Sequence, residues 1–80
     1  MNIWQETDKG LHKQFEFKDF KTAFAFMGQV AEYAEQTQHH PTWTNSWNVV
    51  EIWLITHDAG DVITEKDRSM ATAIDKLFTV

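Results

Sequence analysis

Residues 20–39 have the pattern of an amphipathic helix with a defined start and a defined end. Its apolar side chains recur every three or four positions and form one stripe for the core: Phe20, Ala23, Phe24, Met27, Val30, Ala31 and Ala34. Asp19 stands before the stripe and can cap the first turn. Because Pro41 pushes the residue before it out of the helical region, the helix must end by about His39.

Segments on both sides of this helix have the pattern of β-strands. Residues 11–17 alternate, with Leu11, Phe15 and Phe17 on one face and polar side chains on the other. Residues 42–56 are rich in aromatic and β-branched side chains and are interrupted by Asn and Ser. This pattern predicts a short strand, a tight turn and a longer strand.

The longer of these two strands is apolar on both faces. Its core-facing side chains are expected to be Val50, Ile52 and Leu54. The opposite face carries Val49, Trp53 and Ile55 around Glu51 and is too apolar for a fully solvated surface. We therefore expect this second face to contact another subunit.

A second helix is predicted after a loop at residues 58–61. Thr64 and Asp67 have the spacing of a capping box at its start, and its apolar stripe is Met70, Ala71, Ile74, Leu77 and Phe78. Strands and helices in this order, without βαβ alternation, predict an α+β fold with helices on one face of an antiparallel sheet. We expect a single domain over residues 1–80.

The core of such a small chain is marginal. An 80-residue chain hides only about 60% of the surface that its unfolded form exposes, and no cysteine is present to form a disulfide. Four Trp, six Phe and one Tyr offer more aromatic surface than one small core covers. The sequence therefore predicts an oligomer.

Charge and hydropathy exclude several classes of partner. A formal net charge of −5 argues against non-specific binding to nucleic acid or to an anionic membrane, since both need clustered Lys and Arg. No segment approaches the length of a membrane span, and residues 1–6 lack the pattern of a signal peptide. We expect a cytoplasmic protein.

Three histidines are the candidates for chemistry. His39 and His40 precede Pro41 at the end of the first helix, and His57 follows the longer strand. Imidazole titrates near neutral pH, so a cluster of three could both donate and accept protons. The alternative is that each ring is an ordinary solvated side chain.

Metal binding is a further alternative, because Glu35 and His39 are four residues apart and would share a helix face. No cysteine, HExxH motif or second closely spaced pair accompanies them. We therefore expect no metal site.

The histidines form part of a longer motif. Its elements are Glu35, His39-His40-Pro41, Trp47, His57 and Asp67. Their spacing resembles the signature of the pterin-4a-carbinolamine dehydratase family, and the similarity extends from Trp4 to Phe78. The resemblance implies a four-stranded antiparallel sheet with two or three helices on one face, in a dimer or tetramer. It also implies dehydration of 4a-hydroxytetrahydropterins to quinonoid dihydropterins, which recycles the cofactor of aromatic amino acid hydroxylases.

The resemblance also implies roles for individual residues. The catalytic residues would be His39, His40 and His57, with His39 and His57 as acid and base and His40 holding the substrate. The substrate-binding residues would be Glu35, Pro41, Trp47, Thr56 and Asp58. Neither a metal nor an organic cofactor is implied, since the pterin is the substrate.

Several of these positions have simpler explanations. Trp47 could be a wall or core residue, and the capping box alone explains Asp67. Glu35 could orient His39 through a hydrogen bond or could be solvated. His12, on the polar face of the first strand, is expected to be inert.

Two features depart from the usual pattern of this family. Residues 58–64 are longer than the Gly-containing turn of many members and add a negative charge, so substrate preference or activity could differ here. The sequence begins near Trp4 without the additional N-terminal helix of many relatives, which could change the oligomer. A non-catalytic dimerisation or protein-interaction module on the same fold is the alternative function.

Overall fold

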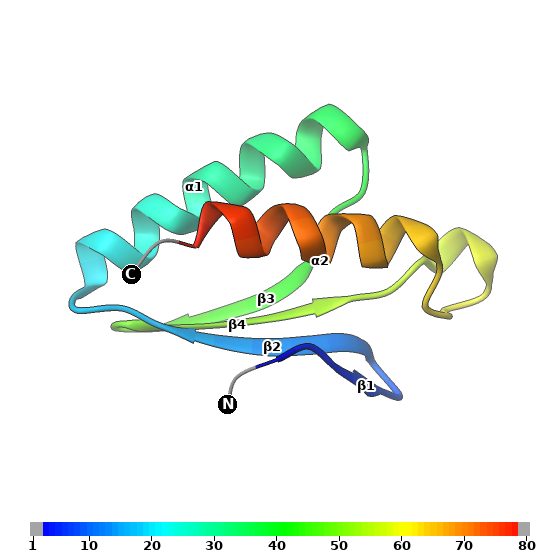
Figure 1. Ribbon diagram of the computed structural model, residues 1–80, viewed down its shortest axis with the longest axis horizontal. Helices are drawn as coiled ribbons and strands as arrows, with labels where there is room; N and C mark the ends of the chain where they lie inside the picture. Colours follow the sequence, from blue (N-terminus) through cyan, green and yellow to red (C-terminus); the bar gives the residue numbers. More distant parts are fainter. Residues whose placement is uncertain (1–2, 79–80) are drawn as a thin grey trace.

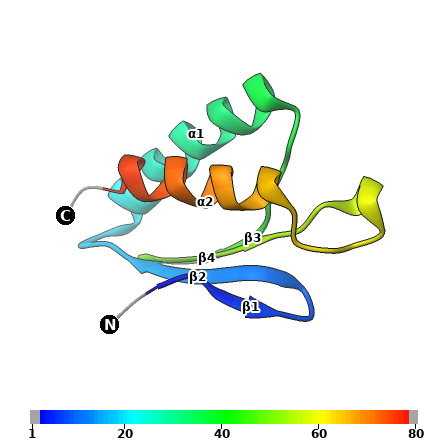
Figure 2. The same cartoon turned by 45° about the vertical axis from the view of Figure 1, so that its right-hand side comes forward.

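The fold is a four-stranded antiparallel sheet with two α-helices on one face, in a computed structural model that describes residues 3–78 (Figure 1). The strands, in the sheet order β1-β2-β4-β3, are β1 (Gln5–Thr7), β2 (Gly10–Glu16), β4 (Val49–Leu54) and β3 (Thr42–Ser46). Helix α1 (Phe20–Thr37) connects β2 to β3. After β4 come a short 3₁₀ helix, η1 (His57–Ala59), and α2 (Glu65–Leu77). A second view places α1 and α2 on the same face of the sheet (Figure 2), which confirms the predicted α+β class.

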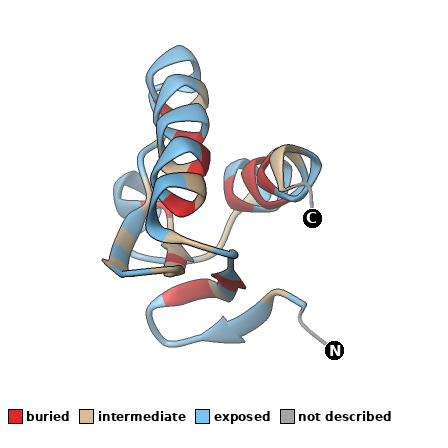
Figure 3. Cartoon of the chain, turned by 90° about the vertical axis from the view of Figure 1, so that its left-hand side faces the viewer, coloured by how far each residue is buried: buried red, intermediate tan, exposed pale blue. Residues whose placement is uncertain are grey.

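The core lies between the sheet and the two helices. Its buried apolar residues are Leu11, Phe15, Ala23, Phe26, Val30, Ala34, Val50, Ile52, Leu54, Met70, Ala71 and Ile74. The buried positions of both helices face the sheet (Figure 3). The core-facing set predicted for the longer strand is confirmed, since all three of its side chains are fully buried.

The predicted apolar stripe of α1 was partly wrong. Phe20 and Phe24 are 47% and 59% exposed and Ala31 is exposed as well, whereas Phe26 is buried at 4%. Phe26 lies three residues after Ala23 and four before Val30, so it belongs to the same helical face as they do. The rings of Phe20 and Phe24 instead stack on each other on the outside, with their centroids 5.7 Å apart.

The two ends of α1 follow from local chemistry. At the start, the Asp19 carboxylate accepts a hydrogen bond from the Thr22 backbone N–H at 2.8 Å, and hydrogen bonds from Thr22 lower the pKa of Asp19. At the end, Gln38 adopts φ +54° and its N–H donates to the Ala34 carbonyl. The helix therefore ends before His39, as predicted, and the chain turns there toward β3.

Gly10 lets the β1–β2 turn lie against the end of β4. Its φ is +111°, and a Cβ atom at this position would lie only 2.1 Å from the carbonyl oxygen of Leu54. Only glycine permits this approach. The turn residues Asp8 and Lys9 are thereby brought next to the segment in which β4 ends.

Helix α2 begins with the predicted capping box. The Thr64 side chain accepts from backbone N–H groups of the first turn, and the Asp67 carboxylate accepts from the Thr64 N–H. Within residues 3–78, neither α1 nor α2 is both long and apolar enough to cross a membrane.

Candidate active site

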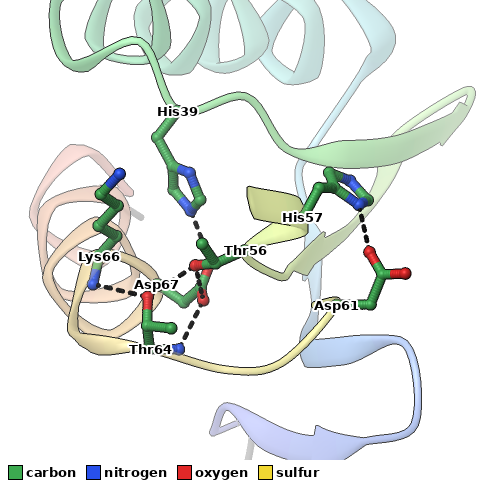
Figure 4. A network of polar contacts seen from close by, with 7 residues as sticks. All are labelled: His39, Thr56, His57, Asp61, Thr64, Lys66 and Asp67. Carbon is green, nitrogen blue, oxygen red and sulfur yellow. Dashed lines mark hydrogen bonds and ion pairs between the residues drawn. The ribbon is translucent and has the colours of Figure 1, made fainter. Parts of the chain in front are cut away.

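Three chain segments meet beside the end of β4. They are the segment after α1, which carries His39, the segment from Thr56 to His57, and the first turn of α2, which carries Asp67 (Figure 4). The first two segments are brought together by the antiparallel pairing of β3 with β4. Residues that are far apart in the sequence thus share one polar network.

Asp67 is the centre of this network. Its side chain is 0% exposed, and one carboxylate oxygen accepts a hydrogen bond from Nε2 of His39 at 2.6 Å. The other oxygen accepts from the Thr56 hydroxyl at 2.7 Å and from the Thr64 backbone N–H at 2.8 Å. Three donors thus converge on one buried carboxylate, so it is fully partnered and held in place.

These donors also set the charge of Asp67. Burial by itself raises the pKa of the carboxyl group, because a buried charge loses its water. The Thr64 N–H, the His39 ring and the Thr56 hydroxyl outweigh this effect and hold the pKa below its ordinary value of 3.8. Asp67 is therefore ionised at neutral pH and can only accept hydrogen bonds.

The state of the His39 ring follows from this. Because an ionised carboxylate accepts only, Nε2 of His39 must carry the hydrogen, and Nδ1 is left for another partner. The His39 side chain is 13% exposed and lines a cavity of about 290 Å³ together with Tyr33, Thr37 and Lys66. One nitrogen of a fixed imidazole thus remains for proton transfer or hydrogen bonding.

His57 contacts its carboxylate partner through the other ring nitrogen, Nδ1. Its Nδ1 lies 2.7 Å from a carboxylate oxygen of Asp61, four residues later, and both side chains are 70% exposed. His57 and Asp61 line a larger cavity, of about 560 Å³, together with Lys9, Thr42 and Trp53. Nε2 is the atom of His57 that can meet a molecule in this cavity.

His40 is held apart from this network. Its Nε2 lies 2.6 Å from a carboxylate oxygen of Glu35, and the pair is exposed to solvent. Glu35 therefore orients His40 and not His39, which corrects the hydrogen bond considered for it. The possible metal pair of Glu35 with His39 is likewise not formed, because each of them pairs with a different residue.

A fourth pair lies on the outer face of the sheet. His12 Nε2 is 2.9 Å from Glu51, and the His12 ring packs at a tilt against Trp53, with the ring centroids 4.8 Å apart. All four histidines of the chain thus have a carboxylate partner, and only His57 uses Nδ1 for it. Within residues 3–78, no cluster of three or more His, Cys, Asp or Glu side chains is arranged to hold a metal ion.

The structure brings together only part of the predicted site. Thr56 is buried, and its hydroxyl contacts Asp67 and Thr64, so it supports the network from within. Asp58 is exposed and lines a separate hollow with Thr56 and Lys66. Pro41 is half-buried and starts the chain toward β3.

Trp47 does not lie near the histidines of its own chain. It is in the turn between β3 and β4, with φ +50° and 64% exposure. The histidines lie at the other end of these strands, which are five and six residues long. A core position is also wrong for this side chain, since it is exposed.

Two contributors to the site, Thr64 and Asp61, were not predicted as site residues. Thr64 was assigned only to the helix cap, yet its N–H and hydroxyl also belong to the Asp67 network. Asp61 was noticed only as an extra negative charge. Its spacing of four from His57 is the one signal in the sequence that could have indicated the contact.

The chain is similar over most of its length to the members of one described protein family. A family model described as Pterin 4 alpha carbinolamine dehydratase matches residues 1–77. A protein of Rhizorhabdus wittichii is 52% identical over 67 residues, which are 84% of this chain and 68% of the relative. A protein of Christiangramia forsetii is 47% identical over 74 residues, which are 92% of this chain and 75% of the relative. The names of both relatives assign pterin-4-alpha-carbinolamine dehydratase only provisionally.

Two solved structures share the fold. A protein of Brucella melitensis, described as a transcriptional coactivator/pterin dehydratase, has 45% identity and a TM-score of 0.86, covering 92% of this chain and 80% of that one. A pterin dehydratase-like protein, described as a RuBisCO assembly factor in the alpha-carboxysome, has 27% identity and a TM-score of 0.74, covering 92% and 87%. The same fold thus carries more than one described role.

Proposed function

Because the chain belongs to the pterin 4 alpha carbinolamine dehydratase family, we propose that it removes water from 4a-hydroxytetrahydropterins to give quinonoid dihydropterins. The observation that carries this proposal is a pair of oriented imidazoles beside the end of β4. His39 is fixed by Asp67 and His57 by Asp61, and each ring lines a cavity. The physiological role would be to recycle the pterin of an aromatic amino acid hydroxylase in the cytoplasm.

The reaction needs two proton transfers. The hydroxyl group at C4a leaves as water after it gains a proton, N5 loses its proton, and a C4a=N5 double bond forms. A neutral imidazole can accept the N5 proton while a protonated imidazole donates to the hydroxyl group. His39 and His57 are the candidates for these two roles.

The arrangement of the two rings supports this division of labour. They are linked through Thr56, whose hydroxyl shares Asp67 with His39 and whose chain neighbour is His57. The proposal requires that one flat bicyclic substrate contacts both rings. His40 and Glu35, at the exposed end of α1, would then contact the outer part of the substrate.

A direct assay tests this function. The purified protein should accelerate loss of the 4a-carbinolamine above the spontaneous rate, and it should do so equally well after treatment with EDTA, because no residue set suited to metal chemistry is invoked. Spontaneous rates only would contradict the proposal. Activity that is lost on chelation and restored by zinc would replace the acid–base mechanism with a metal-dependent one.

A second candidate function is a non-catalytic interaction module. It is favoured by the RuBisCO assembly factor, whose fold is similar, and by the stacked Phe20 and Phe24 rings, which are large and exposed. An interaction module has no need for carboxylate-fixed imidazoles beside a cavity, and for this reason the enzyme is preferred.

We expect the protein to form a dimer or a tetramer at micromolar concentration. Phe20 and Phe24 expose apolar surface on α1, and Trp53 and Ile55 are only half-buried on the outer face of the sheet. Burying such surface between copies is favourable. Sedimentation equilibrium should give a multiple of the chain mass, and Phe24→Glu should weaken the association if α1 is the contact. A monomer at high micromolar concentration would contradict this expectation.

A further inference from the structure

We propose that Asp61 is a positioning residue that fixes the His57 ring with Nε2 directed to the substrate. The inference rests on the proposed dehydratase function and adds a residue to its machinery. The contact that carries it is the 2.7 Å hydrogen bond from Nδ1 of His57 to the Asp61 carboxylate. Because an ionised carboxylate accepts only, this bond keeps the hydrogen on Nδ1 and leaves the Nε2 lone pair free to take a proton.

The backbone conformation at Asp61 is unusual for a residue that carries a side chain. Asp61 has φ +58°, in the left-handed region that side-chain-bearing residues rarely adopt, and the preceding Gly60 has φ +94°. Glycine would adopt this conformation without strain, whereas an aspartate adopts it at some cost. A strained backbone at a pocket is a reason to look for a function of the side chain. Here the side chain contacts a proposed catalytic imidazole.

Main-chain hydrogen bonds hold the backbone of the loop at Asp61. The Asp61 N–H donates to the Thr56 carbonyl at 3.1 Å, and the Thr56 N–H donates to the Val62 carbonyl at 2.9 Å. Neither bond involves the Asp61 side chain. The carboxylate is therefore presented to His57 by a loop that does not depend on it, so the side chain can be changed while the loop is kept.

The surroundings place this pair at a binding site. His57 and Asp61 both line the cavity of about 560 Å³, and its other lining residues include Trp53, Ile55, Asp8 and Lys9. Water screens an exposed pair and leaves it weak. A flat ligand that covers the cavity would displace that water and strengthen the hold of Asp61 on the ring.

Two substitutions distinguish a role of Asp61 in positioning the His57 ring from a role in the structure of the loop. Asp61→Gly removes the acceptor and relieves the backbone, whereas Asp61→Asn keeps an acceptor oxygen and tolerates the left-handed conformation. The main readout is the tautomer of His57, measured from its imidazole ¹⁵N shifts in the uniformly labelled protein. The second readout is kcat and KM in the dehydratase assay.

We expect Asp61→Gly to melt at or above the wild-type temperature, because the loop is relaxed. Its His57 ring should nevertheless shift from the Nδ1–H form toward the Nε2–H form that free histidine favours. Its kcat should fall about threefold to tenfold, the effect of losing one hydrogen bond, with KM little changed. Asp61→Asn should keep the wild-type tautomer and most of kcat.

A wild-type tautomer in Asp61→Gly would overturn the positioning role, as would an equal loss of kcat in both variants. The tautomer readout does not depend on catalysis. If the wild-type protein has no dehydratase activity but Asp61→Gly still changes the tautomer, the proposed function fails while the hold of Asp61 on His57 is supported.

Discussion

His57→Ala should lower kcat and kcat/KM together, by about a hundredfold or more, the usual size of a positioned proton transfer. The reason is that a transferred proton contributes in the transition state and hardly at all in the ground state. His57 lies at the surface, with a side chain that is 70% exposed, so its removal should leave the fold intact. Rates are to be measured against the spontaneous dehydration, with thermal melting as the check on folding.

The other histidines supply the matched controls. His39→Ala should show a similar loss, and the double variant should lose less than the product of the single losses, because an acid and a base in one step do not act independently. His40→Ala should mainly raise KM. His12→Gln removes a ring that also has a carboxylate partner but does not line either cavity, and it should keep near wild-type kinetics. Wild-type rates in both His39→Ala and His57→Ala would remove the histidines from the mechanism.

Asp67→Asn should lower the free energy of unfolding by about 3 kcal/mol at neutral pH, the size expected when a buried charged network loses one partner. All three groups aimed at Asp67 are donors: the His39 ring, the Thr56 hydroxyl and the Thr64 N–H. An amide can accept on its oxygen only, and its NH₂ group would face a donor. Urea denaturation measures the loss, and the same variant should lose activity because His39 is no longer held.

Asp75→Asn is the matched control for this effect. Asp75 likewise accepts a hydrogen bond from another side chain, that of Lys13, but it is 42% exposed, so its loss should cost less than about 1 kcal/mol. Equal effects of the two substitutions would contradict the central place given to Asp67.

The same carboxylate predicts how stability depends on pH. The pKa of Asp67 is lower in the folded protein than its ordinary value of 3.8. The contribution of ionised Asp67 to the free energy of unfolding is therefore fully present above this value. It is lost as the pH falls through the folded-state pKa. The wild-type protein should lose this part of its stability in acid, and Asp67→Asn should show a shallower decline over that range.

The sequence predicted the elements that bury an apolar face. Strand β4 and helix α2 lie where the periodicity of Val50, Ile52 and Leu54 and the Thr64 capping box indicated. Strand β1 left no signal, because all three of its residues are exposed and polar. The pattern also could not separate Phe24 from Phe26, since both have helical spacing to other apolar residues of α1.

The candidate site was predicted in some of its residues but not in its contacts. The resemblance named His39, His57 and Asp67, yet the pairing of Asp67 with His39 depends on how α2 packs beside the end of β4. The capping box alone accounts for an aspartate at position 67, so the sequence did not indicate that Asp67 also binds the His39 ring. Trp47 shows the opposite case, since its position in the sequence motif does not bring it near the histidines of its own chain.

Binding of one pterin by both His39 and His57 is the claim on which the proposed function depends, and a titration tests it most directly. The measurement follows the imidazole ¹⁵N signals of the labelled protein as a stable 7,8-dihydropterin is added. The two histidines are assigned through His39→Gln and His57→Gln. We predict that both rings shift together and saturate at one dissociation constant, since a single flat ligand would contact both His57 and His39, each of which lines a cavity. Rings that stay unchanged up to millimolar dihydropterin, or that respond with two unrelated affinities, would contradict a shared pterin site.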